Sequence, residues 1–259
     1  MTQDLLYDKR GDIGWITFNR PQARNALTFA MYEGLAEICG RVATTHEAKV
    51  LVITGAGDKA FAAGTDIAQF KSFKDGDDGI AYERKMDRIL DAVERCAVPT
   101  IAAIAGYCTG GGAAIAAVCD FRIASVSAQF GFPIARTLGN CLSMPNYARL
   151  ASLIGPQRVK EMILLAKMMD ATTALQVGLV SEVLPGAAGL HARAQELAST
   201  LAGHAPLTMQ TTKEALRRLQ AKLGDENIDD LIRHTYGSAD FREGMSAFLE
   251  KRPPKWSGR

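Results

Sequence analysis

The 259-residue sequence lacks several features that would place it in a specialised class of protein. Its longest apolar runs are shorter than a membrane span and are interrupted by glycine, which argues against a transmembrane helix. The N-terminus lacks a basic segment followed by an apolar core, so no secretory signal is expected. Lys and Arg total 30 against 28 Asp and Glu, and the net charge of +2 argues against nucleic-acid and membrane partners. We therefore expect a soluble, cytoplasmic protein.

Cysteine is scarce and shows no pattern. Five cysteines occur in the whole sequence, and no two of them form a Cys-x-x-Cys pair. An odd number of scattered cysteines argues against a disulfide framework and against a metal site, so reduced thiols are predicted. The five are Cys39, Cys96, Cys108, Cys119 and Cys141.

The most informative stretch covers residues 98–120, VPTIAAIAGYCTGGGAAIAAVCD. Residues 100–105 form an apolar run long enough for one buried strand, and residues 113–119 are typical of a helix buried on all sides. Three glycines at 110–112 lie between them. A turn of this kind leaves free backbone N–H groups at the positive end of a helix dipole, which suits a site that stabilises negative charge. The alternative is that the glycines only let the helix pack closely on a sheet.

Strands and helices alternate along the chain up to about residue 185, and only helices follow. The expected strands are a hairpin over 5–18 and single strands at 49–54, 100–105, 121–124 and 179–184. The expected helices cover 29–44, 80–95, 113–119, 146–154, 156–169, 172–177 and much of the chain after 191. Irregular segments are expected at 55–69, at 71–79, which is predicted to be a mobile loop, and at 129–144. This order predicts an α/β core over residues 1–190 and a C-terminal helical region over residues 191–259.

One motif suggests a dinucleotide-binding fold. Gly55, Gly57 and Ala60 follow a predicted strand with the spacing G-x-G-x-x-A. The motif requires a helix to begin at these glycines, and Gly64 interrupts that helix. We therefore consider this match weak.

Three sequence blocks form an ordered set. They are NRP at 19–21 with NAL at 25–27, KAFAAGTDI at 59–67, and AGYCTGGG at 105–112, closing with CD at 119–120 and QFG at 129–131. Together with weaker echoes toward the C-terminus, these blocks resemble the enoyl-CoA hydratase/isomerase family, or crotonase superfamily, over essentially the whole chain. The resemblance implies an α/β fold made of a crotonase-like spiral of ββα units with a helical C-terminal region. It also implies assembly as a homo-trimer or hexamer.

The resemblance further implies that the chain acts on an acyl-CoA thioester, with coenzyme A as part of the substrate and no bound cofactor. Matched residue by residue, the two backbone N–H groups that would hold the thioester oxygen and stabilise an enolate belong to Thr65 and Gly111. Arg24 is a candidate phosphate contact, although a solvated surface arginine is an equal alternative. The implied coenzyme A or substrate contacts are Arg24, Ala26, Ala63, Thr65, Asp66, Ile67, Ala68, Tyr107, Gly111 and Ile134.

The sequence departs from the family at its acid–base positions. Family hydratases carry two glutamates, and the matching positions here are Ala114 and Ile134. A third position, where isomerases and hydrolases often carry an acid, is Leu142. Alanine, isoleucine and leucine cannot exchange protons, so standard hydration is not expected.

Nearby residues offer partial substitutes. Asn140 could orient a carboxylate or water, or simply end a turn; Cys141 could be a nucleophile, or a small buried filler. A family decarboxylase has tyrosine at the position of Cys141 and histidine at that of Thr65, and loss of CO₂ creates the enolate without a base. Asp66 and Asp120 are expected to be structural partners of backbone N–H groups or arginines.

Two functions therefore compete. The first is an enzyme of this family that stabilises a thioester enolate and works as an isomerase, decarboxylase, hydrolase or atypical lyase. The alternative is a catalytically weak acyl-CoA-binding protein. In either case, apolar residues of the C-terminal region are expected at an oligomer interface. These are Leu197, Leu201, Leu216, Leu219, Phe248 and Leu249.

Overall fold

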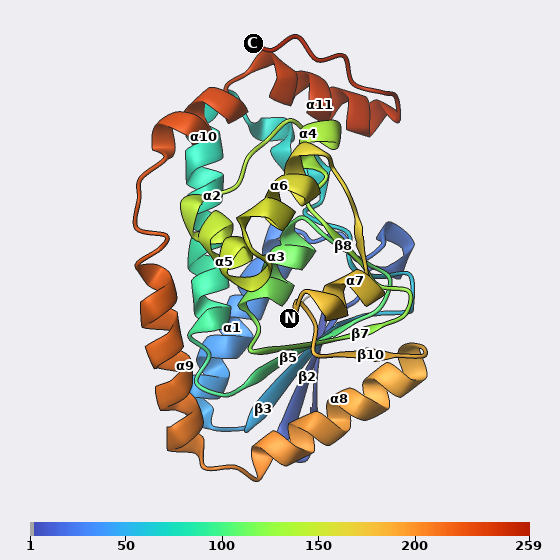
Figure 1. Cartoon of the computed structure of the whole chain (residues 1–259), viewed down its shortest axis with the longest axis vertical. Coiled ribbons are helices and arrows are strands. Elements are labelled where there is room, and N and C mark those ends of the chain that lie inside the picture. The colour runs from blue at the N-terminus through green and yellow to red at the C-terminus, as the bar shows by residue number, and fades with distance from the viewer. Residues whose placement is uncertain (1–2) are drawn as a thin grey trace.

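The computed structural model describes residues 3–259 and contains two β-sheets surrounded by helices (Figure 1). The larger sheet has the strand order β1–β2–β3–β5–β7–β10. β1 and β2 form the antiparallel hairpin that was expected over 5–18, and every other neighbouring pair is parallel. Its strands are β1 Leu5–Arg10, β2 Ile13–Phe18, β3 Val50–Gly55, β5 Thr100–Ile104, β7 Phe121–Ser125 and β10 Glu182–Leu184.

The larger sheet is buried on both faces, which explains why its central strands are apolar without alternation. In β3, Val50 and Val52 pack with helix α8 (Ala187–Ala202), which lies along the outer face of the sheet in Figure 1. Leu51 and Ile53 point to the opposite face and join the main core beneath helices α1, α2 and α3. Successive side chains of a strand point to opposite faces, so each apolar run serves two cores.

The smaller sheet has the strand order β4–β6–β8–β9, with only β9 antiparallel. The pairs β3–β4, β5–β6 and β7–β8 each place one strand in the larger sheet and the next in the smaller one, and a helix follows. This repetition is the crotonase-like spiral of ββα units that the resemblance implies, so the predicted fold class is confirmed. The strands are β4 Ala60–Ala62, β6 Tyr107–Thr109, β8 Gln129–Gly131 and β9 Met169–Asp170.

The helices include several short ones that the sequence interpretation missed. The expectation of unbroken irregular structure over 55–69 and 129–144 was wrong, because β4, β8 and two short helices form there. Strands of three residues are too short to show a period of two. The helices up to β10 are η1 Pro21–Ala23, α1 Phe29–Thr45, η2 Ile67–Ser72, α2 Gly76–Glu94, α3 Gly111–Val118, α4 Ile134–Thr137, α5 Met144–Ile154, α6 Pro156–Leu164 and α7 Ala171–Gln176.

The prediction of a mobile loop over 71–79 was also wrong, because α2 begins at Gly76. Asp75 and Asp78 form a capping box at this end of α2, each side chain accepting backbone N–H bonds. The glycines that suggested a loop instead allow a helix to pack closely. A Cβ on Gly76 would lie 2.1 Å from the carbonyl oxygen of Arg233, and one on Gly79 would lie 2.3 Å from Cβ of Tyr236. Both contacts belong to helix α10 (Asp229–Tyr236).

The C-terminal helices are α8, α9 Pro206–Ala221, α10 and α11 Ala239–Glu250. The boundary drawn between residues 190 and 191 falls inside α8, whose Leu190, Ala194 and Ala198 pack under the larger sheet. Leu197 and Leu201, two of the residues expected at an oligomer interface, pack against the same core and are partly buried. None of the helices within residues 3–259 is both long enough and apolar enough to cross a membrane.

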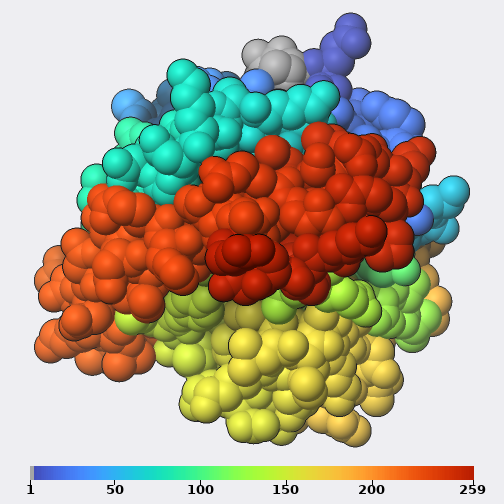
Figure 2. Space-filling model, turned by 90° about the horizontal axis from the view of Figure 1, so that it is seen from above, coloured from blue at the N-terminus to red at the C-terminus, as the bar shows by residue number. Residues whose placement is uncertain are grey.

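Helices α10 and α11 cover one side of the core. They pack against α2 and η2 through a separate hydrophobic cluster that includes Phe70, Ile80, Tyr236 and Phe241. Figure 2 shows this C-terminal part of the chain as a band between the segment containing α2 and that containing α6. Phe248 of α11 reaches a cavity whose other lining residues belong to the first 146 residues of the chain.

Candidate active site

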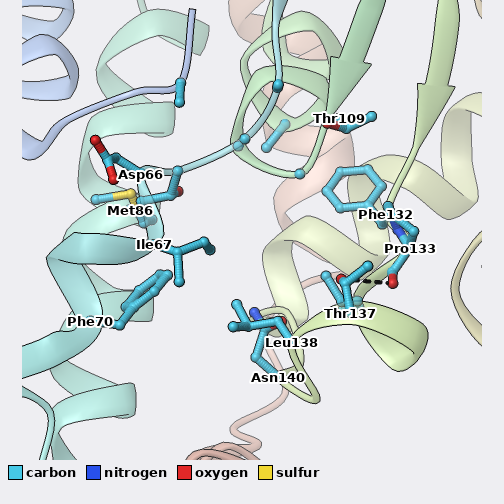
Figure 3. A pocket seen from close by; sticks show the side chains of 18 of the residues that line it. Asp66, Ile67, Phe70, Met86, Thr109, Phe132, Pro133, Thr137, Leu138 and Asn140 are labelled. Atoms are coloured by element: carbon cyan, nitrogen blue, oxygen red, sulfur yellow. Dashed lines mark hydrogen bonds between the residues drawn. The ribbon is translucent and has the colours of Figure 1, made fainter. Parts of the chain in front are cut away.

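A cavity of about 430 Å³ lies between η2 and α2 on one side and residues 132–146 on the other. Figure 3 shows Ile67, Phe70 and Met86 on the first side and Leu138 and Asn140 facing them. Most of the lining is apolar, so charges and dipoles inside the cavity are screened less than they would be in water. The two glycine-bearing turns of the sequence blocks form part of its wall.

The first turn presents the amide of Thr65. Leu27 forms a parallel bridge with Thr65, in which the Leu27 N–H donates to Gly64 O (2.8 Å) and the Asp66 N–H donates to Leu27 O (2.8 Å). Because the neighbours of Thr65 face Leu27, its own N–H points away from Leu27. Within residues 3–259, no protein oxygen accepts a hydrogen bond from the Thr65 N–H.

The side chain of Asn25 holds this turn in place. Asn25 is fully buried, and its Nδ2 donates to Ala60 O (2.7 Å) and Ala56 O (3.1 Å) while its Oδ1 accepts from the Arg20 N–H (3.0 Å). These bonds fasten the 20–27 segment to β4. The NAL block therefore acts through structure, by fixing the strand that leads into Thr65.

The second turn presents the amide of Gly111, the first residue of α3. Gly110 has φ 51° and ψ −123°, a conformation that only glycine adopts readily. A Cβ on Gly110 would lie 3.4 Å from Cα of Gly64, so the two turns touch. In the described part of the chain, the Gly111 N–H also lacks a protein acceptor, as expected at a helix N-terminus. Two unpaired amides therefore lie at adjacent turns on one cavity wall.

A row of hydroxyl groups lies beside these amides, and no sequence motif predicted it. The Thr65 hydroxyl lies 2.9 Å from the Tyr32 hydroxyl and 2.9 Å from the Tyr82 hydroxyl. A Cβ on Gly111 would lie only 1.7 Å from the Tyr32 hydroxyl. Gly111 is therefore required for a second reason besides its backbone, because any side chain there would displace Tyr32.

The expected coenzyme A contacts mostly lie on the cavity wall. Arg24 is exposed, and its guanidinium lies 5.3 Å from the ring centroid of Tyr107, an exposed residue that also lines the cavity. Ala68 is not among the lining residues in the described chain; it is exposed, and its N–H donates to Asp66 Oδ1 (3.1 Å). The expected residues that do line the cavity are Arg24, Ala26, Ala63, Thr65, Asp66, Ile67, Tyr107, Gly111 and Ile134.

The three positions matched to family acids are also on the wall. Ala114 lies one turn into α3, Ile134 begins α4, and Leu142 precedes α5; all three are buried and line the cavity. The positions at which family members carry a proton-transferring side chain are therefore apolar surface in this cavity. Any acid or base in this cavity has to come from elsewhere in the chain.

Glu83 of α2 is such a group, and the sequence interpretation overlooked it. It is 3% exposed and lines the cavity. Its Oε1 accepts from the Tyr236 hydroxyl (2.5 Å) and its Oε2 accepts from the Ser143 N–H (3.0 Å). Burial raises the pKa of Glu83 to about 8. The available signal was a carboxylate on the apolar face of α2, three residues from both Ile80 and Met86.

Asn140 and Cys141, the two remaining candidate residues, differ in their position relative to the cavity. Asn140 lines the cavity, and its Nδ2 donates to the Tyr236 hydroxyl (3.2 Å). Cys141 is not among the lining residues of the described chain, and burial raises the pKa of its thiol to about 12. A thiol in that environment is a poor nucleophile.

The two aspartates of the blocks have the structural roles expected of them. Asp66 accepts from Arg20 Nη1 (3.0 Å) and, as the N-cap of η2, from the Ala68 N–H in the first turn of that helix. Asp120 accepts from the Thr100 N–H (2.8 Å) and pairs with Lys213 of α9, so its cationic partner is a lysine and not an arginine.

Comparison with known proteins identifies the family. The sequence model described as "Enoyl-CoA hydratase/isomerase" matches residues 8–259. The chain belongs to the enoyl-CoA hydratase/isomerase family. It is 32% identical to the short-chain-enoyl-CoA hydratase of Clostridium acetobutylicum, over 96% of this chain and 95% of the relative. It is 37% identical to the (E)-benzylidenesuccinyl-CoA hydratase of Thauera aromatica, over 95% and 96%.

A solved structure adds a relative whose name gives a different reaction. The fold matches that of a methylmalonyl-CoA decarboxylase in complex with 2-nitronate-propionyl-CoA, with a TM-score of 0.89 and 27% identity over all of both chains. This enzymatic family therefore includes proteins named for hydration and for decarboxylation of CoA thioesters. Family membership fixes the fold and the acyl-CoA chemistry in outline, and the reaction has to be argued from the side chains of this chain.

Proposed function

We propose that this chain is an acyl-CoA enzyme that stabilises a thioester enolate between the amides of Thr65 and Gly111. The observation that carries the proposal is the pair of unpaired N–H groups at two touching turns, one of them at a helix N-terminus, on the wall of an apolar cavity. Donors placed in advance where charge develops cost no reorganisation during the reaction, and one such donor is typically worth about 10²–10³ in rate.

In this mechanism the two amides bind the thioester oxygen of the substrate. When a bond at the α-carbon breaks, its electron pair moves onto that oxygen and the carbonyl becomes an enolate. The Thr65 and Gly111 N–H groups then bind an oxygen of greater negative charge, so their bonds strengthen in the transition state. The helix dipole of α3 adds to the same stabilisation.

The exposed guanidinium of Arg24 is suited to bind a phosphate of coenzyme A. It lies beside Tyr107 at the cavity wall, where a charge can remain hydrated. The apolar part of the cavity, between Ile67 and Leu138, then suits the acyl group. Arginine binds phosphate well because its planar fork donates two parallel hydrogen bonds.

The reaction we propose is not standard hydration. Ala114, Ile134 and Leu142 provide no acid–base pair, whereas isomerisation, decarboxylation and thioester hydrolysis can each proceed through a stabilised enolate or oxyanion. The second candidate function is an acyl-CoA-binding protein with little catalysis. It is favoured by the same three apolar side chains, which leave the positions matched to family acids without a carboxyl group.

A panel of thioesters tests the proposal. The purified protein is incubated with 2-enoyl-, 3-enoyl-, malonyl- and saturated acyl-CoA, and the products are followed by mass spectrometry. Binding is measured in parallel by calorimetry with the saturated thioester. Turnover of any member supports the enzyme. Binding without turnover of any member supports the second candidate, and absence of both contradicts the two functions together.

A further inference from the structure

Glu83 is unusual among the ionisable side chains of the cavity wall. Within the described lining, the residues with charged side chains are Arg24, Asp66 and Glu83. Arg24 is exposed, and Asp66 accepts hydrogen bonds from Arg20 and from the Ala68 N–H in the first turn of η2. Glu83 alone is a buried carboxyl group, placed between the apolar side chains of α2. The mechanism proposed above does not use it.

The hydrogen bonds around Glu83 determine which group donates and which accepts at each contact. Nδ2 of Asn140 can only donate, so the Tyr236 oxygen accepts from it (3.2 Å). The Tyr236 hydrogen is then free to point to Glu83 Oε1 at 2.5 Å, and the Ser143 N–H donates to the other oxygen. Both donors stabilise the carboxylate form. They also fix the carboxyl group on the cavity wall while each oxygen keeps one acceptor site.

The neighbouring carboxylate, Asp87, has a different setting one turn further along α2. The Ser143 hydroxyl donates to Asp87 Oδ1 (2.6 Å), so Ser143 bridges the two acids. Asp87 is not among the lining residues of the described cavity. The titratable groups that act on Glu83 or are acted on by it come from α1, α2, the 138–147 segment and α10; they are Tyr32, Tyr82, Asp87, Cys141, Tyr147 and Tyr236.

We infer that Glu83 is the proton-carrying residue of this site, taking a proton from the substrate's α-carbon while the thioester oxygen is bound by Thr65 and Gly111. This inference rests on the function proposed above. In the step, the α-C–H bond breaks, an O–H bond forms on Glu83, and the C–H electron pair moves onto the thioester oxygen as an enolate. The step needs no oxidant, reductant or second substrate.

A single proton carrier points to an isomerase. Hydration needs one group to activate water and another to deliver a proton, and only one carboxyl group serves the apolar part of the described cavity wall. With a 3-enoyl thioester, removal of the α-proton gives a dienolate, and the same Glu83 can return the proton to the γ-carbon. The double bond then moves into conjugation with the thioester, and atoms and charge balance. The substrate class is therefore a β,γ-unsaturated acyl-CoA.

The raised pKa of Glu83 suits a residue that carries a proton between two carbon atoms. A proton carrier is most effective when its pKa lies near the working pH, because both forms are then populated. Burial raises the pKa of Glu83 to about 8, with Asp87 adding to the rise and the bonds from Tyr236 and Ser143 opposing it. A solvated glutamate would be almost wholly ionised at neutral pH and would be a weak proton donor.

Solvent exchange tests the inference. Wild type and variants are incubated with 3-butenoyl-CoA in D₂O, and deuterium in the recovered thioester and conversion to the 2-enoyl isomer are measured by mass spectrometry. We expect wild type to isomerise the thioester, with deuterium incorporated whenever Glu83 exchanges its proton with solvent before returning it. Glu83→Gln should isomerise at least about 100-fold more slowly with unchanged affinity for a saturated acyl-CoA. The matched control is Asp91→Asn, which neutralises a carboxyl group on the same helix outside the described cavity lining and should remain within about threefold of wild type.

The outcomes separate failure of the role given to Glu83 from failure of the proposed acyl-CoA function. If Glu83→Gln is folded and isomerises the substrate within tenfold of the wild-type rate, Glu83 is not the proton carrier, although the proposed function stands. If wild type binds thioesters but neither isomerises 3-butenoyl-CoA nor exchanges its α-hydrogens, the inference is overturned. Failure to bind or convert any thioester contradicts the proposed function itself. Should Glu83→Gln not fold, Glu83→Asp decides: a folded variant with wild-type affinity and a rate at least tenfold lower supports the inference, and a wild-type rate overturns it.

Discussion

The hydroxyl of Tyr236 donates a hydrogen bond to Glu83 at 2.5 Å, although 153 positions separate the two residues. Tyr236 ends α10, and Gly79 of α2 lets it approach because a side chain there would overlap its Cβ. The C-terminal helical region therefore provides a direct partner for the buried acid of the cavity. It completes the candidate site in addition to any part it plays in assembly.

Removing this partner should change the pH dependence of catalysis. The Tyr236 hydroxyl lowers the pKa of Glu83, so Tyr236→Phe should raise that pKa above its value of about 8. The rate limb that rises with pH as Glu83 ionises should then move to higher pH, which a pH–rate profile of isomerisation measures. Tyr147→Phe, which removes a nearby hydroxyl that is not bonded to Glu83, should leave the limb in place. A limb unmoved by Tyr236→Phe would contradict the role given to this bond.

Glu83 should cost stability at high pH. Its folded-state pKa of about 8 lies above the unfolded value near 4.5, so the folded state holds its proton more tightly. Between these pH values the unfolded state has lost the proton and the folded state has kept it. The contribution of Glu83 to the free energy of unfolding therefore falls as pH rises, by about 1.4 kcal/mol per unit at most.

Glu83→Gln removes this dependence. Paired denaturant melts at pH 5 and pH 8 should show the variant gaining stability relative to wild type as pH rises. Asp91→Asn, on the same helix, controls for general loss of a carboxylate from α2. An equal difference between wild type and Glu83→Gln at both pH values would show that the Glu83 pKa is not raised in the folded protein.

Hydration of crotonyl-CoA should be slow or undetectable. Ala114 and Ile134 leave the wall without the acid and base that hydration needs, and a positioned acid or base is typically worth about 10²–10⁴ in rate. The measurement is a hydration assay beside the Clostridium acetobutylicum relative. Equal rates would show that the missing pair is replaced by other side chains. Ala114→Glu with Ile134→Glu should raise the rate, unless the two buried charges unfold the protein.

The protein should form a trimer or hexamer. Leu216 and Leu219 of α9 are 60% and 63% exposed, and Phe248 and Leu249 of α11 are 53% and 40% exposed. Apolar side chains repeated along helix faces in this way favour a partner surface, and the family resemblance suggests the number of subunits. Sedimentation should give a multiple of 27.8 kDa, and Leu216→Glu with Leu219→Glu should lower it. A monomer at micromolar concentration would contradict the prediction.

The sequence was most informative where a pattern was long or a motif depended on backbone. The strands around residues 50 and 100 and the helix after Gly111 follow from long apolar runs, and glycine at 64 and 110 marks backbone that other residues rarely adopt. The glycine turn at 110–112 was sufficient to predict free amides near Gly111, whereas pairing Gly111 with Thr65 depended on the family resemblance. Strands of three residues and the capped start of α2 were missed, because they carry too few residues for a period to show.

The side chains of the site were harder to predict, because they meet only through tertiary packing. Glu83 becomes significant only once Ser143 and Tyr236 are seen to bond to it, and those residues lie 60 and 153 positions away. Tyr32 likewise reaches Gly111 from a different helix. Sequence motifs describe the amides well because each amide is positioned by its own local turn. The setting of Glu83, in contrast, is formed by three segments that are distant in the sequence.

The most direct test of the enolate site is the ¹³C NMR shift of a bound thioester carbonyl. Replacing Gly111 alone is uninformative, because any side chain there meets the Tyr32 hydroxyl at 1.7 Å. Tyr32→Phe removes that obstacle, so Gly111→Ala and Gly111→Pro are compared within it; proline differs in lacking the N–H. We predict a downfield carbonyl shift on binding of a [1-¹³C]-labelled saturated acyl-CoA to wild type and the alanine variant, and its loss in the folded proline variant. A bound carbonyl with the same shift in all three proteins, or with the shift of the free thioester in wild type, would contradict an oxyanion site at Thr65 and Gly111.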